Sequence, residues 1–73
     1  MTNNLLLNAA IAHYKAQQAE AVASIMLYMN NSVGVGDHSD HLKEIIKWTE
    51  KLTEADDCLA TLTRYFLSKD ENG

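Results

Sequence analysis

The densest group of side chains that could do chemistry is the segment Asp37-His38-Ser39-Asp40-His41. His38 and His41 stand three residues apart, so on a helix both imidazoles could reach one metal ion, with a carboxylate as third ligand. Structural zinc sites normally use four protein ligands, however, and no cysteine lies nearby. Acids at a helix start also cap the helix and favour its dipole, with Asp37 as the first candidate cap and Ser39 as the alternative. We therefore expect no metal ion or cofactor at this segment.

The acidic segment 54–57 (Glu-Ala-Asp-Asp) is similar to half of the magnesium site of the all-α nucleotide pyrophosphohydrolases. Those enzymes need a second acidic pair on the preceding helix, whereas the first half of this chain offers only Glu20. Cys58 follows these acids and has no neighbouring histidine or helix N-terminus that would activate a thiol. We expect none of these side chains to be catalytic.

The second half of the chain carries a stripe of apolar residues that recur in alternating steps of three and four. This spacing places them on one face of a helix, where only another helix can cover them in water. The members of this stripe, the second-helix seam, are Ile45, Trp48, Leu52, Ala55, Leu59, Leu62 and Phe66. Acids and lysines alternate on the opposite face, which is typical of a solvated surface. The pattern predicts a helix over about 38–68, followed by a polar tail over 69–73.

The first half of the chain predicts another helix, over about 5–30, because it lacks glycine and proline and is rich in alanine. Large apolar residues gather on one of its faces, with Gln18 in their midst: Leu7, Ile11, Tyr14, Val22, Ile25 and Met29. A second face consists of Ala9, Ala12, Ala16, Ala19, Ala23 and Met26, and its five alanines are called the alanine seam. One helix cannot cover so wide an apolar arc, so we expect a second copy of the chain to cover the remainder.

The residues 31–37 between the helices predict a short hinge. Gly34 and Gly36 tolerate the positive φ values that end helices, and a connection this short makes the helices antiparallel neighbours. The expected fold is all-α: one domain over 1–73, a two-helix antiparallel hairpin that dimerises into a four-helix bundle. The residues expected in its core or interface are Ala9, Ala12, Ala16, Ala19, Ala23, Ile11, Val22, Ile25, Ile45, Trp48, Leu52, Leu59, Leu62 and Phe66.

The composition indicates in which compartment the protein occurs and which classes of partner are unfavourable. Cys58 is the only cysteine, so an internal disulfide is impossible and a reducing cytoplasm is expected. The formal net charge of −4 argues against nucleic acid or an anionic membrane as a partner. No window is long and apolar enough to span a membrane.

The hinge and its flanks, Tyr-Met-Asn-Asn-Ser-Val-Gly-Val-Gly-Asp-His over 28–38, carry a family resemblance. An Asn-x-Val-Gly-x-Gly-acid-His hinge between an Ala/Gln-rich and a Lys/Glu-rich helix resembles small helical-hairpin proteins of tailed bacteriophages. Ser32 stands where that family pattern has proline. The resemblance implies a phage source, hence the host cytoplasm, and implies no activity.

These features favour a non-enzymatic helical protein that acts by self-association and protein–protein contact, as a phage accessory or host-directed factor. The alternative is a nucleic-acid-binding hairpin similar to the RNA-binding Rop-type bundle, which would need a basic exposed face. A metal-dependent enzyme similar to the nucleotide pyrophosphohydrolases comes third.

Overall fold

The computed structural model describes residues 4–30 and 38–67, and the side chains of His38 and Ser39 are not among the described parts. Helix α1 spans Leu5–Asn30 and helix α2 spans His38–Leu62. A π-helical turn, η1, continues α2 over Thr63–Leu67. From Leu5 onward the described residues are all helical, with two helices and no strand, as the sequence predicts. The predicted hinge residues Gly34, Gly36 and Asp37 and the tail over 69–73 lie outside the described residues.

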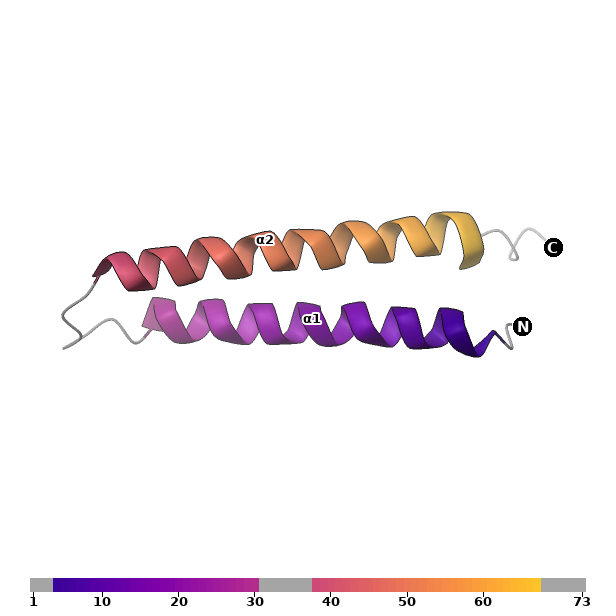
Figure 1. Ribbon diagram of the computed structural model, residues 1–73, viewed down its shortest axis with the longest axis horizontal. Helices are drawn as coiled ribbons and strands as arrows, with labels where there is room; N and C mark the ends of the chain where they lie inside the picture. The colour runs from indigo at the N-terminus through magenta and orange to yellow at the C-terminus, as the bar shows by residue number, and fades with distance from the viewer. Residues whose placement is uncertain (1–3, 31–37, 68–73) are drawn as a thin grey trace.

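The two helices lie side by side and run in opposite directions (Figure 1). The molecule is a rod with extents of 56 × 17 × 15 Å. Its radius of gyration is 16.5 Å, where a compact domain of this length has about 11 Å. An elongated pair of helices has more surface for its mass than a globule, so most side chains remain in contact with solvent.

Helix α1 begins at a side-chain cap that the sequence analysis did not identify. The Asn4 Oδ1 atom accepts a hydrogen bond of 3.0 Å from the backbone N–H of Leu7. The Asn4 carbonyl accepts a second bond of 3.0 Å from the N–H of Asn8. An asparagine that bonds the third N–H of a helix satisfies one of the donors that the first turn leaves without a partner.

We expect Asn4→Ala to lower the free energy of unfolding by about 1 kcal/mol, because the Leu7 N–H loses its acceptor. Urea denaturation followed by circular dichroism measures this loss. Asn4→Asp is the matched control, since aspartate caps as well as asparagine does. Equal stability of the alanine and aspartate variants would show that the cap does not stabilise α1.

Seven positions of α1 in alternating steps of three and four face α2. Ala21 has no exposed surface, and the other six are half-buried: Leu7, Ile11, Tyr14, Gln18, Ile25 and Tyr28. On α2, Ala55 also has no exposed surface. It lies within the seam that the sequence predicts, and the other seam members that are half-buried are Ile45, Trp48, Leu52, Leu59 and Leu62. The two small alanines allow the helices to approach each other closely.

Phe66 differs from its predicted place on the seam, because its side chain is 54% exposed. The cause is η1, whose i→i+5 hydrogen bonding adds one residue to the turn and changes the direction of the side chains that follow. Leu67 is the half-buried residue at the end of this turn.

The contact between the helices is thin. Among the described residues, only Ala21 and Ala55 are buried apolar residues, and no larger side chain is fully buried. A chain of 73 residues is marginal even when it forms a compact core. The hairpin alone therefore buries little apolar surface for a chain of its length.

Candidate interaction surface

The side chains with potential for chemistry do not form a metal site in the part of the chain that the structure describes. Residues 4–30 and 38–67 contain no group of three or more His, Cys, Asp or Glu that could hold a metal ion. His41 instead contacts the ring of Tyr28, with centroids 5.4 Å apart. Asp56 accepts a hydrogen bond of 2.7 Å from the Gln18 Nε2 atom of the other helix.

Cys58 lies in a shallow groove between the helices, toward the end of α2. The groove has a volume of about 390 Å³ and is lined by Ala10, Tyr14, Asp57, Cys58, Thr61 and Leu62. A hydrogen bond with the Cys58 side chain, followed by the charge of that group, raises the pKa of Tyr14 above its usual value. This contact joins two half-buried side chains across the hairpin.

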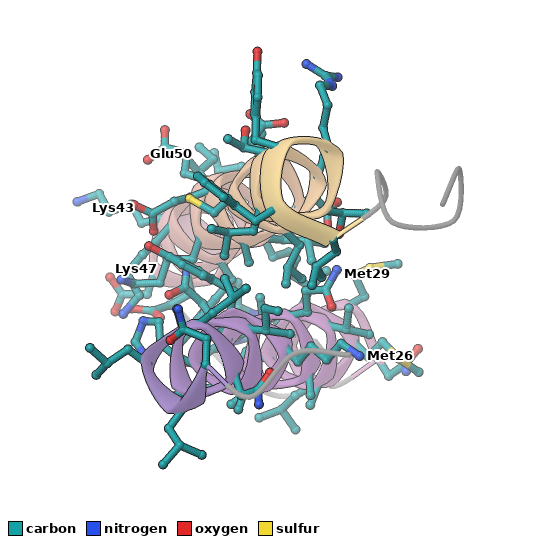
Figure 2. The ribbon with its side chains drawn as sticks, turned by 90° about the vertical axis from the view of Figure 1, so that its right-hand side faces the viewer. Met26, Met29, Lys43, Lys47 and Glu50 are labelled. Carbon is teal, nitrogen blue, oxygen red and sulfur yellow. The ribbon has the colours of Figure 1, made fainter. Side chains whose placement is uncertain are left out.

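One side of the hairpin, the charged flank, combines polar residues of both helices. Figure 2 shows Lys43, Lys47 and Glu50 of α2 on this side of the molecule. Lys47 forms an ion pair of 3.2 Å with Glu44 and lies 5.0 Å from the centre of the Trp48 ring. Because positive and negative side chains alternate along α2, the described part of this flank presents no basic stripe for nucleic acid.

Gln17 joins the helices on the charged flank. Its Nε2 atom donates to the backbone carbonyl of Lys51 at 2.9 Å and to Glu54 Oε1 at 2.8 Å. The sequence alone does not reveal this role of Gln17, since a glutamine that faces solvent and one that spans two helices have the same helical position.

The opposite side is formed mainly by apolar residues of both helices. We call it the uncharged flank because most of its side chains carry no charge, although Lys15 and Asp56 lie in its groove. Figure 2 shows Met26 and Met29 of α1 on this side, away from the labelled lysines. Helical spacing places on the same flank Ala19 and Val22 of α1, and Leu42, Ile46 and Leu52 of α2. Five of these side chains are between 43% and 63% exposed: Val22, Met26, Met29, Leu42 and Ile46.

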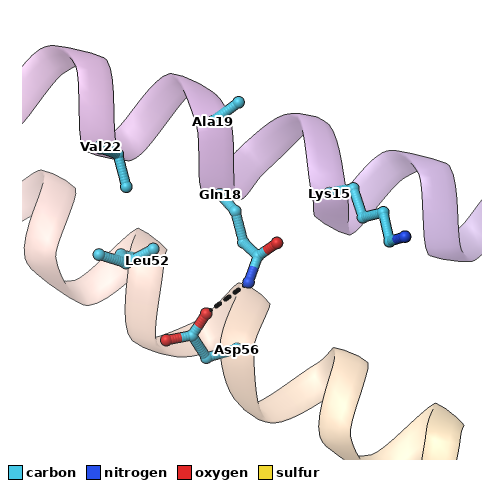
Figure 3. Close-up of a pocket in the computed structure, with 6 residues that line it drawn as sticks. All are labelled: Lys15, Gln18, Ala19, Val22, Leu52 and Asp56. Atoms are coloured by element: carbon cyan, nitrogen blue, oxygen red, sulfur yellow. Dashed lines mark hydrogen bonds between the residues drawn. The ribbon is translucent and has the colours of Figure 1, made fainter.

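A groove follows the middle of the uncharged flank (Figure 3). Its volume is about 510 Å³, and its lining residues are Lys15, Gln18, Ala19, Val22, Leu52 and Asp56. The bond from Gln18 to Asp56 crosses it. Lys15 and Asp56 are the charged residues of this groove, and Lys15 forms no ion pair with any other described residue.

The structure separates the interface residues that the sequence predicts into two groups. Ile11, Ile25 and the half-buried members of the second-helix seam lie between the helices. The alanine seam is exposed along its length, on the part of α1 that points away from α2. Val22 is also exposed and lies on the uncharged flank. The participation of these exposed residues in an interface stays a prediction.

Ala21 is the described core residue that the sequence analysis missed. The signal was present in the sequence, because steps of four and three from Leu7 lead through Tyr14 and Gln18 to Ala21 and Tyr28. The polar Gln18 at the centre of this series concealed it.

No described helix is sufficiently long and apolar to cross a membrane. Comparison of the chain with protein-family models, with curated proteins and with solved structures finds no match.

Proposed function

We propose that this chain is a non-enzymatic helical protein of the cytoplasm that acts by self-association and protein–protein contact. Its active form is a homodimer in which two hairpins make a four-helix bundle. The observation that carries the proposal is the exposure, among the described residues, of ten large apolar side chains, from 43% at Val22 to 84% at Leu6, beside a described core of two alanines.

The exposed apolar surface favours association of the hairpins. Burial of apolar surface is the main favourable term in folding, and each square ångström removed from water contributes about 25 cal/mol. The hairpin alone leaves much of its apolar surface in water, although a domain of this size has little stability to spare. A second copy of the chain is a partner that is always present at the concentration of the chain itself. In a twofold interface the same apolar surface of each copy covers that of the other.

The resemblance of the hinge to small phage hairpin proteins supports a role as a phage accessory or host-directed factor. Such a factor would present the charged flank to its target, because dimerisation through apolar surface leaves that flank exposed. Capture of host proteins by the tagged dimer, compared with Lys47→Glu as a matched variant, tests this part of the proposal. A host protein retained equally by both forms would show that the charged flank does not select the target.

We expect light scattering at micromolar concentration to give twice the 8.1 kDa mass of the chain. The midpoint of thermal unfolding should rise with protein concentration, because association stabilises only the folded state. A monomeric mass together with a midpoint independent of concentration would contradict self-association.

A further inference from the structure

We propose that the second copy occupies the uncharged flank, so that α1 of each protomer lies over α2 of its partner. The twofold axis is then parallel to the helices, and the Asn30 ends of both α1 helices lie at the same end of the bundle. This inference rests on the self-association proposed above, and it adds the face, the topology and a pair of partner contacts.

The solvent-accessible area of the chain exceeds that of a compact monomer by about the area that one partner buries in a protein–protein interface of ordinary size. A compact monomer of 8.1 kDa exposes about 4,500 Å², whereas this chain exposes 5426 Å². The surplus, 5426 Å² less about 4,500 Å², is roughly 900 Å². Each partner in a standard protein–protein interface buries about 800 Å². Burial of one flank of each hairpin would therefore lower the accessible area of the chain to that of a compact protein of the same mass.

The chemistry of the uncharged flank suits burial better than that of the opposite flank. Its large exposed apolar side chains are aliphatic or methionine, and methionine adapts to irregular gaps. The hydroxyl of Thr49, which lies beside Leu52, already donates a bond of 2.7 Å to the Ile45 carbonyl. Burial of this threonine therefore leaves no hydroxyl proton without an acceptor.

The two charges in the groove decide the topology. The bond from Gln18 to Asp56 and the contact of Tyr14 with Cys58 fix how the two helices are aligned along the rod. Lys15 lies between the levels of Cys58 and Asp56. Rotation about a twofold axis parallel to the helices leaves the height of every residue along the rod unchanged and places α1 of one protomer opposite α2 of the other. It therefore brings the Lys15 ammonium over the partner's Asp56, twice in each dimer.

The other twofold axis in the plane of this flank is perpendicular to the helices and places α1 over the partner's α1. Glu20 is the single acid on α1, and it lines a groove of the charged flank with His13 and Lys51. Lys15 would then meet no carboxylate on the uncharged flank. Charge complementarity therefore favours the parallel axis.

A matched pair of alanine substitutions identifies the face. Ala19 lines the groove of the uncharged flank, whereas Ala16, also exposed, lines the groove with Glu20 and Trp48. We expect Ala19→Glu to raise the dissociation constant of the dimer at least 100-fold, and Ala16→Glu to change it less than about threefold. Sedimentation equilibrium measures both constants. The reverse order would overturn the proposed face while leaving self-association intact, and a monomeric wild type would overturn both.

Charge exchange tests the contact between Lys15 and the partner's Asp56. In Lys15→Asp, two carboxylates face each other at each contact, and in Asp56→Lys, two ammonium groups do so. A dimer of one Lys15→Asp chain with one Asp56→Lys chain restores an opposite pair at both contacts. Native mass spectrometry of an equimolar mixture should therefore show the mixed dimer well above the statistical half. A statistical mixture would overturn the contact, and helical circular dichroism of each variant alone verifies that it folds.

Spin labels determine the direction of the axis. Asn30→Cys is labelled in the Cys58→Ser background, where serine keeps a hydroxyl to bond Tyr14. With both Asn30 ends together, the separation of the labels should be below about 25 Å, because neighbouring helices lie about 8–10 Å apart. A perpendicular axis through the middle of α1, which overlaps the two hairpins fully, would place them about 39 Å apart, the length of the 26 residues of α1. A long separation would overturn the topology.

Discussion

Leu59→Ala is expected to lower the free energy of unfolding by about 2–3 kcal/mol, the lower part of the range for buried leucines. Leu59 is half-buried on the seam between the helices, so the substitution removes part of a leucine's burial rather than all of it. No large side chain among the described residues is fully buried, and the seam leucines therefore provide much of the contact. A loss of this size is a large fraction of the stability of a small domain.

Urea denaturation of Leu59→Ala and of the control Leu5→Ala at one protein concentration measures the difference. Leu5 is 80% exposed on the same hairpin, and its truncation should change the free energy of unfolding by less than about 0.5 kcal/mol. An unchanged midpoint for Leu59→Ala would mean that the seam does not stabilise the fold.

Ala55→Leu is expected to destabilise the hairpin by about 1–3 kcal/mol, through overpacking rather than through loss of contact. Ala55 has no exposed surface, so a larger side chain must push α1 away. The displacement would also stretch the nearby bonds from Gln17 to Glu54 and from Gln18 to Asp56, which are 2.8 Å and 2.7 Å long.

Ala16→Leu is the matched control for this overpacking, because Ala16 is exposed on α1 and lies outside the uncharged flank. Its effect on stability should stay within about 0.5 kcal/mol. Both variants are compared by thermal unfolding at equal concentration. Equal stability of the two variants would indicate that the helices are not in close contact at Ala55.

The sequence predicts the second helix better than the first, for a physical reason. The second-helix seam contains large apolar residues such as Trp48 and Leu52 at every turn, so its period is unambiguous. The first helix is apolar over a wide arc, and propensity alone does not decide which part of the arc meets α2. Contacts of Gln17 and Gln18 with the other helix fix this rotation, and such contacts are tertiary.

The existence of two distinct flanks was also beyond the sequence analysis. A flank combines residues of two helices, and its composition depends on their relative rotation. Val22 was grouped with Leu7 as a core residue, although it lies beside the core at the edge of the groove. The helical period assigns a residue to a face within an error of about one position, or 100°. This error is enough to move Val22 from the core to the flank.

The π-helical turn η1 determines what the loss of one residue would do to the end of the rod. Such a turn contains one residue more than the α-helix it interrupts, as a single-codon insertion would produce. Removal of Thr63 would return the segment to an unbroken α-helix and shift Leu67 to the position that the seam period reserves for Phe66. A variant without Thr63 would therefore retain an apolar contact at the end of the rod, and it would turn the exposed rings of Tyr65 and Phe66 to new positions around the helix axis.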